Sequence, residues 1–254
     1  DAISSYGAVI SSLCRGLSPK VTREIDVGGE LSGGAVAAGF LLLIGCLLWQ
    51  RRAQQHFAAQ RAAIFDDCRQ LIQAAEQIHP GSDYPLLRGT YGDAKVLLQP
   101  LLDHVGYRKV PSLWLVLTLD APMPAGGTLD ILFRPANIEF FSQIDQLPQR
   151  IHLGDEWPSH HMARVSPAGW QAPLTTVHSA LGDTLSSADL KEIVITPRGV
   201  RLVVRVCGVE RGQYMVLRAM VPEAERIPPD WVGYWLDVLV SVSGAVRADL
   251  AEAA

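Results

Sequence analysis

One short stretch of the chain gathers the side chains that most often bind metal ions in proteins. Histidine nitrogens and carboxylate oxygens are ligands for zinc. They follow neither the HExxH pattern nor another spacing that would place two ligands on one face of a helix. We interpret the stretch as a solvated loop, and a metal-dependent enzyme that uses the His152–His161 loop is the alternative. The residues are His152, Asp155, Glu156, His160 and His161, with His178 further along the chain.

Cysteines are the other residues with catalytic potential, and none stands in a recognisable motif. Cys68 follows Asp66 and Asp67, but the 4 cysteines are widely spaced and any such chain allows similar pairings. The chain has no GxSxG elbow, no GxGxxG after a strand and no GxxxxGK[ST] loop. We therefore predict no catalytic residue, no metal ligand and no bound cofactor, and we expect that the protein is not an enzyme.

Arginines alternate with apolar residues near the C-terminal third of the chain. Because successive side chains of a strand point to opposite faces, Arg201 and Arg205 should lie on one side, with Arg198 in the preceding turn. This basic face, together with Arg51 and Arg52 nearer the N-terminus, is a candidate contact for a partner or for anionic headgroups. The ordinary solvent side of a sheet is the simpler interpretation. A net charge of −4 gives no electrostatic reason to expect nucleic acid as a partner.

One segment near the N-terminus has the length and composition of a transmembrane helix. Residues 31–50 carry no formal charge, and at ~1.5 Å per residue they span ~30 Å, the thickness of a bilayer's hydrocarbon core. A buried helix of a globular protein is the alternative. Arg51 and Arg52 follow directly. Since cytoplasmic flanks carry the excess of basic residues, we expect a single-pass protein of the cell inner membrane, with its N-terminus outside.

The segments on either side of this anchor are also expected to be helical. Residues 1–30 carry apolar residues at spacings of three and four, typical of an amphipathic helix at a membrane interface. Residues 51–79 continue the helical pattern and are predicted to form a stalk. Small residues and a leucine recur at helical spacing within the anchor, and such a face lets another helix approach closely. This predicted packing face consists of Gly34, Ala38, Leu41 and Gly45.

Residues 80–254 are predicted to form one soluble α+β domain, an antiparallel sheet with helices packed on it. The nearly continuous apolar character of residues 113–119 indicates a central strand. A final amphipathic helix, opened by Pro228 and Pro229, should cover the sheet. Further strands are expected over residues 128–134, 191–196, 200–207 and 213–220, and further helices over residues 137–147 and 174–190.

Together these features predict a non-catalytic accessory or structural subunit of a larger membrane protein complex. An anchor with a packing face, an amphipathic N-terminal segment and a stalk each require a partner, and an autonomous enzyme would not need all three. The expected partners are the lipid bilayer and other integral membrane subunits. Photosynthetic and respiratory energy-converting complexes are the hosts considered. Two alternatives stay open, which are a membrane-tethered metal-dependent enzyme and a membrane-anchored domain that senses a ligand.

Overall fold

The computed structural model describes residues 33–79, 84–103, 112–135, 139–209 and 226–252. The chain divides into two compact units, Asp1–Gln54 and Gln55–Ala254. The second unit contains every strand that the structure describes, together with helices α3 (Leu174–Leu181) and α5 (Pro229–Glu252). This organisation confirms the prediction of an α+β domain built on an antiparallel sheet.

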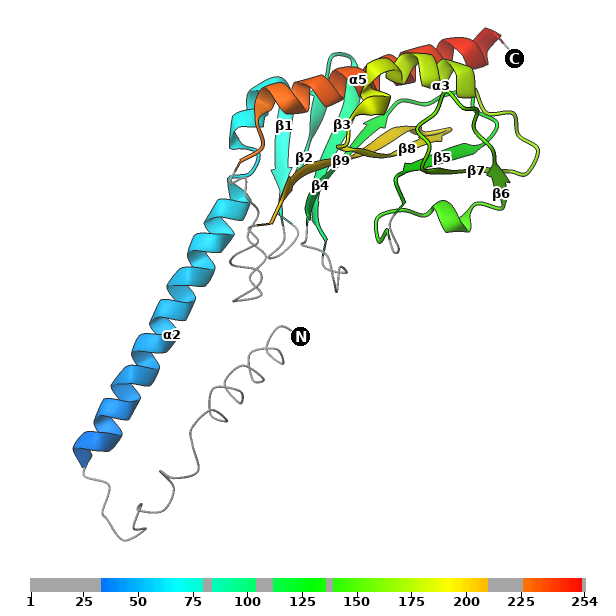
Figure 1. Cartoon of the computed structure of the whole chain (residues 1–254). Helices are drawn as coiled ribbons and strands as arrows, with labels where there is room; N and C mark the ends of the chain where they lie inside the picture. Colours follow the sequence, from blue (N-terminus) through cyan, green and yellow to red (C-terminus); the bar gives the residue numbers. More distant parts are fainter. Residues whose placement is uncertain (1–32, 80–83, 104–111, 136–138, 210–225, 253–254) are drawn as a thin grey trace, which may run out of the picture. The chain divides into compact units, whose positions relative to one another are not determined.

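The sheet has nine strands in the order β1-β2-β3-β4-β9-β8-β5-β7-β6, and every neighbouring pair is antiparallel. Figure 1 shows the strands as one continuous layer. Four strands, β4, β5, β8 and β9, match their predictions closely, and β4 lies in the interior of the sheet, as expected. The strands are β1 (Gln73–Ile78), β2 (Leu86–Tyr91), β3 (Ala94–Leu102), β4 (Ser112–Asp120), β5 (Thr128–Phe133), β6 (Gln149–Ile151), β7 (His161–Ser166), β8 (Leu190–Thr196) and β9 (Gly199–Gly208).

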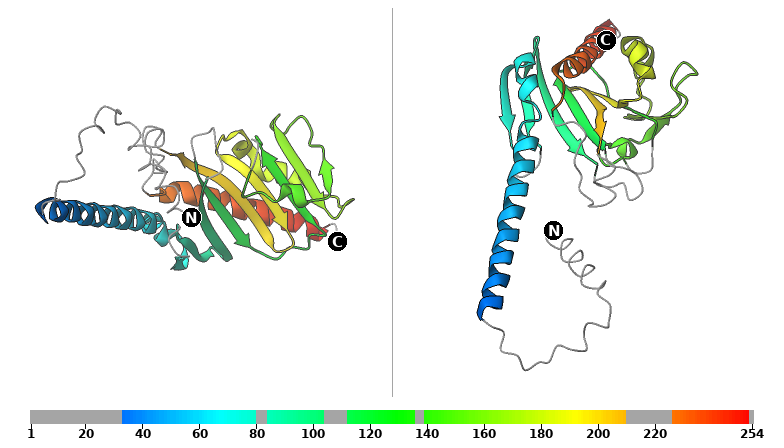
Figure 2. Two further views of the ribbon diagram at one scale, coloured as in Figure 1. Left: turned by 90° about the horizontal axis from the view of Figure 1, so that it is seen from below. Right: turned by 60° about the vertical axis from the view of Figure 1, so that its left-hand side comes forward.

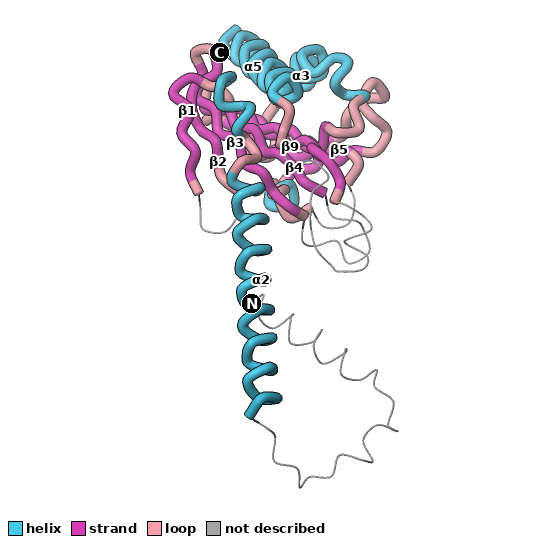
Figure 3. The backbone as a smooth tube through the Cα atoms, turned by 90° about the vertical axis from the view of Figure 1, so that its left-hand side faces the viewer, coloured by secondary structure: helices cyan, strands magenta, loops and turns pink. Residues whose placement is uncertain are grey.

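The hydrophobic core lies between one face of the sheet and the two helices. Alternate residues of the strands point to this face, and on β4 they are Leu113, Leu115, Leu117 and Leu119, each at most 1% exposed. Helices α3 and α5 lie side by side over it, as Figures 2 and 3 show. The predicted C-terminal helix is thereby confirmed as the cover of the sheet.

Local sequence explains where these two helices begin and end. Pro229 occupies the first helical position of α5, where its missing N–H is not needed, and Asp230 follows in the first turn. Helix α3 ends at Gly182, whose φ of 49° is one that glycine adopts at little cost. The predicted helix over residues 174–190 therefore stops early. A short 3₁₀ turn, η5 (Gly182–Ser186), and strand β8 occupy the rest.

The helical stalk predicted to reach His79 is wrong beyond residue 62. Helix α2 (Gly33–Ala62) ends at Ala62 and is followed by a 3₁₀ turn, η3 (Asp66–Leu71), and by β1. Tertiary contacts override the helical pattern here. Phe65 and Cys68 are fully buried in the domain core, and the Cys68 thiol donates to Ile227 O at 3.2 Å. The backbone from residue 73 onward pairs with β2 instead of extending a helix.

The sheet face opposite the helices, called the second face below, is partly covered by residues 139–147. No regular α-helix forms over them, in contrast to the prediction for residues 137–147, of which 137 and 138 lie outside the described residues. They contain only a 3₁₀ turn, η4 (Ile144–Gln146), which contacts β5 and β7. Phe141 packs against Trp114 of β4, with ring centroids 5.6 Å apart. The strand predicted over residues 213–220 also lies outside the described residues.

Helix α2 carries the predicted anchor. Within the described residues, no helix combines the length and the apolar character that crossing a bilayer requires.

Two residues of the predicted packing face on α2 lie in open surroundings. Leu41 is 70% exposed, and a Cβ atom added at Gly45 would meet no atom within 4 Å. The side chains at Gly34 and Ala38 lie outside the described residues.

Candidate functional site

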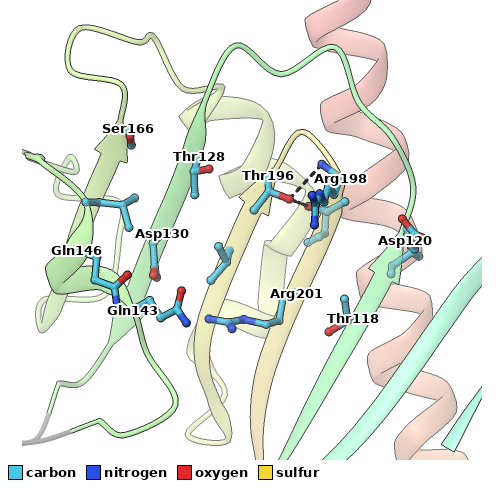
Figure 4. Close-up of a pocket in the computed structure, with 15 residues that line it drawn as sticks. Thr118, Asp120, Thr128, Asp130, Gln143, Gln146, Ser166, Thr196, Arg198 and Arg201 are labelled. Carbon is cyan, nitrogen blue, oxygen red and sulfur yellow. Dashed lines mark hydrogen bonds between the residues drawn. The ribbon is translucent and has the colours of Figure 1, made fainter.

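The second face of the sheet holds a cleft of about 680 Å³, shown in Figure 4. Four neighbouring strands supply its floor, and η4 forms one wall. Hydroxyl groups, side-chain amides and charged groups all reach it. The polar lining residues are Thr118 and Asp120 of β4, Thr128 and Asp130 of β5, Thr196 of β8, Arg201 of β9, Arg198 of the β8–β9 turn, Gln143, Gln146 and Ser166.

Strand register places the charged residues of the floor in line. Arg201 of β9 pairs with Val194 of β8, and Val194 in turn pairs with Asp130 of β5. Because residues that pair directly lie on the same face of a sheet, the arginine and the aspartate point to the same side. A bulge between Leu190 and Glu192 sets Glu192 opposite Val203, and the alternation of side chains then turns it to the second face as well. Residues more than 60 positions apart in sequence meet through this pairing.

Arg201, Glu192 and Asp130 form a buried cluster of charged groups. The Arg201 guanidinium donates to Glu192 Oε2 at 2.9 Å. Glu192 is 0% and Asp130 is 1% exposed. Three of their buried polar atoms have no hydrogen-bond partner within the described structure, namely Asp130 Oδ1, Glu192 Oε1 and Arg201 Nε. A buried polar atom without a partner costs about 1–3 kcal/mol, and the hydrogen bonds between the two carboxyl groups and from Ser142 to Glu192 satisfy only part of the cluster.

Burial and mutual repulsion make both carboxyl groups hard to ionise. Desolvation by burial, the charge of Glu192 and a hydrogen bond with it raise the pKa of Asp130 from 3.8 to about 8, against the opposing charge of Arg201. Burial also raises the pKa of Glu192, which Arg201 partly offsets. Among the described residues one cation pairs with these two carboxyl groups, and both of their pKa values are raised, so the pair favours holding a proton.

The structure brings together only part of the predicted basic face. Arg198 and Arg201 line the cleft. Arg205 pairs instead with Asp189 at 3.0 Å, at an exposed position. Arg51 and Arg52 are exposed on α2, in the other unit. The structure therefore makes Arg201 the counter-ion of the buried Glu192 carboxylate, whereas the sequence suggested a solvent-facing residue.

Sequence reasoning missed Asp130 and Glu192. Each is a charged residue inside an apolar strand, Asp130 between Leu129 and Ile131 and Glu192 beside Ile193. A charge at an interior strand position is a recognisable signal, since buried carboxylates require a partner. The partner itself could not be read from the sequence, because the pairing of β5, β8 and β9 decides it.

The histidine-containing loop lies around a second cleft, of about 720 Å³. His160 and His178 line it, with Glu156 and Arg134. His178 packs edge-to-face on Trp157 at 5.1 Å between ring centroids, and His161 Nδ1 lies 2.7 Å from the carbonyl oxygen of Pro158. Among the residues that the structure describes, no three histidine, cysteine or carboxylate groups gather as metal ligands. Two strands that the sequence did not predict, β6 and β7, flank this loop.

Comparisons with protein-family models, with curated proteins and with solved structures gave no match to this chain. The residues and their geometry are therefore the basis for inferring what the protein does.

Proposed function

We propose that this protein is a membrane-anchored, non-catalytic subunit of a larger membrane assembly, with residues 31–50 as a single transmembrane helix. The observation that carries the proposal is an apolar run on α2 whose side chains are exposed. Eight large apolar residues between Phe40 and Trp49 are 47–76% exposed. Each would bury its surface in lipid at a gain of about 25 cal/mol per Å².

The charges that follow the run support one orientation. Arg51 and Arg52 are exposed directly after it, and basic residues of this kind are retained on the cytoplasmic side. We propose that the domain from residue 55 onward is cytoplasmic and that the N-terminus lies outside. The host is an inner-membrane complex, with photosynthetic and respiratory energy-converting complexes as the first to test.

The small residues of the anchor support a contact with another membrane helix. The open space around Gly45 leaves room for a neighbouring backbone, and close packing drives helix association where the hydrophobic effect does not. In this proposal the partner helix packs on Gly34, Ala38, Leu41 and Gly45.

A second function, a membrane-anchored domain that senses a ligand, is favoured by a different observation. The cleft on the second face is within the usual size range of small-molecule sites and has unpartnered buried polar atoms at its floor. The metal-dependent enzyme has no comparable support, since His161 and His178 contact backbone carbonyl oxygens and His178 also packs on the indole ring of Trp157.

Fractionation of cells that express the full chain tests the anchor. The protein should stay in the membrane pellet after alkaline carbonate extraction, and deletion of residues 31–50 should release it. Protease added to intact spheroplasts should leave the domain uncut. A full chain that carbonate extracts completely would refute the anchor, and digestion of the domain in spheroplasts would reverse the orientation.

Substitutions in the helix test the assembly. Gly34→Leu and Ala38→Leu make the anchor more apolar, so membrane levels should hold while co-purification of the partner in mild detergent falls. Leu43→Ile, away from the packing face, should leave both unchanged. Undiminished association in both variants would mean that the helix is a tether only.

A further inference from the structure

The cluster on the second face lacks one positive charge. Asp130 and Glu192 supply two carboxyl groups, and among the residues that the structure describes Arg201 is the cation that pairs with them. Two basic residues of neighbouring strands are engaged elsewhere. Lys191 pairs with Glu139 at 2.7 Å, and Arg164 donates to Leu147 O at 3.0 Å. A proton on Asp130 balances the charge of the cluster.

The unpartnered oxygens show what kind of group would replace that proton. Asp130 Oδ1 and Glu192 Oε1 are both hydrogen-bond acceptors, and Asp130, unlike Glu192, is among the residues that line the cleft. An ammonium or guanidinium group carries three to five N–H donors and no acceptor. It would satisfy a buried carboxylate and restore the missing charge with one group.

We propose that the cleft on the second face binds an organic cation, whose ammonium or guanidinium group is held by the Asp130 carboxylate. The surrounding lining suits such a group, because the hydroxyls of Thr118 and Thr128 and the amide oxygens of Gln143 and Gln146 accept hydrogen bonds. Asp120 and Arg198, which also line the cleft, carry opposite charges. This site does not depend on the membrane anchor.

Binding exchanges one proton for one cation. The ligand keeps all its protons, and the Asp130 carboxyl group loses its own to solvent, so the charge of the cluster is unchanged. Below the raised pKa of Asp130, about 8, affinity should therefore rise about tenfold per pH unit as one proton is released. A neutral ligand, or a cation bound elsewhere on the surface, would not release this proton.

The test uses agmatine, which carries both a guanidinium and an ammonium group, as the probe. Isothermal titration of the purified full chain in detergent at pH 6, 7 and 8, in phosphate and in HEPES, measures affinity and released protons together. We expect saturable binding that tightens with pH and releases close to one proton per ligand at pH 6–7. No saturable binding at any of these pH values, or an affinity that stays level with pH, would overturn the proposal.

Two variants assign the site. Asp130→Asn keeps the shape of the neutral carboxyl group but cannot ionise, so it should weaken agmatine binding at pH 8 by tenfold or more and abolish the pH dependence. Asp145→Asn removes a carboxylate that is 86% exposed and should change nothing. Equal binding by wild type and Asp130→Asn would refute the role of Asp130. If N-acetylarginine amide binds more tightly than agmatine, the natural ligand is an arginine side chain of a protein. If agmatine binds more tightly, the natural ligand is a free amine.

Discussion

The strongest consequence of the buried cluster concerns stability, and Asp130→Asn isolates it. In the folded protein Asp130 keeps its proton up to about pH 8, whereas in the unfolded chain the carboxyl group loses it near its ordinary value of 3.8. Between these values the folded state binds one proton more than the unfolded state. The free energy of unfolding of the wild type should therefore fall by about 1.4 kcal/mol for each pH unit of increase across this range.

Asparagine does not titrate, so the variant should lack this contribution. The difference in stability between Asp130→Asn and wild type should grow in favour of the variant by about 1.4 kcal/mol per pH unit between pH 5 and 7. For a domain of about 200 residues, 1 kcal/mol shifts Tm by about 2–4 °C, so the gap should widen by about 3–6 °C per pH unit. Thermal unfolding followed by circular dichroism at pH 5, 6 and 7 measures it.

The exposed carboxylate of Asp145 provides the matched control. Its side chain is 86% exposed and lies 3.9 Å from Arg164, so Asp145→Asn should run parallel to wild type at every pH. If Asp130→Asn also runs parallel to wild type, Asp130 ionises normally in the folded state. The charge balance inferred for the cluster would then be refuted.

Two further predictions test the packing of the domain by urea unfolding. Leu239 of α5 is fully buried, so Leu239→Ala should cost about 2–5 kcal/mol, while Val240→Ala at a 39% exposed neighbour should cost less than about 1 kcal/mol. Gly199 has a φ of 154° and a Cβ there would lie 1.9 Å from Leu119 O, so Gly199→Ala should separate β4 from β9 and prevent stable folding. Gly92→Ala, at a turn with open space and a φ of 57°, should cost only about 1–2 kcal/mol, and similar losses at both glycines would contradict the steric argument.

Much of the sheet and its covering helix could be predicted because the local pattern and the tertiary environment agree there. The apolar run of β4 is buried in the middle of the sheet, and the segment Pro197–Arg198 lies in the turn of the β8–β9 hairpin. The apolar stripe of α5 is buried through Trp235, Leu239 and Val242. Tyr234, the neighbour of Trp235 on this helix, is 49% exposed and lies outside the buried stripe.

The predictions failed where a helical period coincides with contacts that no local pattern reveals. Ile64 and Cys68 fit a helix, yet both lie in the domain core within a turn and a 3₁₀ segment. The sequence of β1, Gln73–Ile78, has little strand propensity and forms a strand because β2 pairs with it. Short polar strands such as β6, with only three residues, depend on their neighbours in the same way.

The candidate site shows the same limit more sharply, because its members are ordinary residues until the sheet forms. Folding alone does not require the cluster. When apolar residues of similar volume replace a buried ion pair, the protein is often as stable as before or more stable. The cluster instead lowers stability as the pH rises toward 8, because a buried carboxyl group is kept from ionising. The second face could have been closed by side chains like Val194 and Val203, which are already buried beside it. A buried acid that lines a cleft and has an unpartnered oxygen is better explained by what it binds than by what it stabilises.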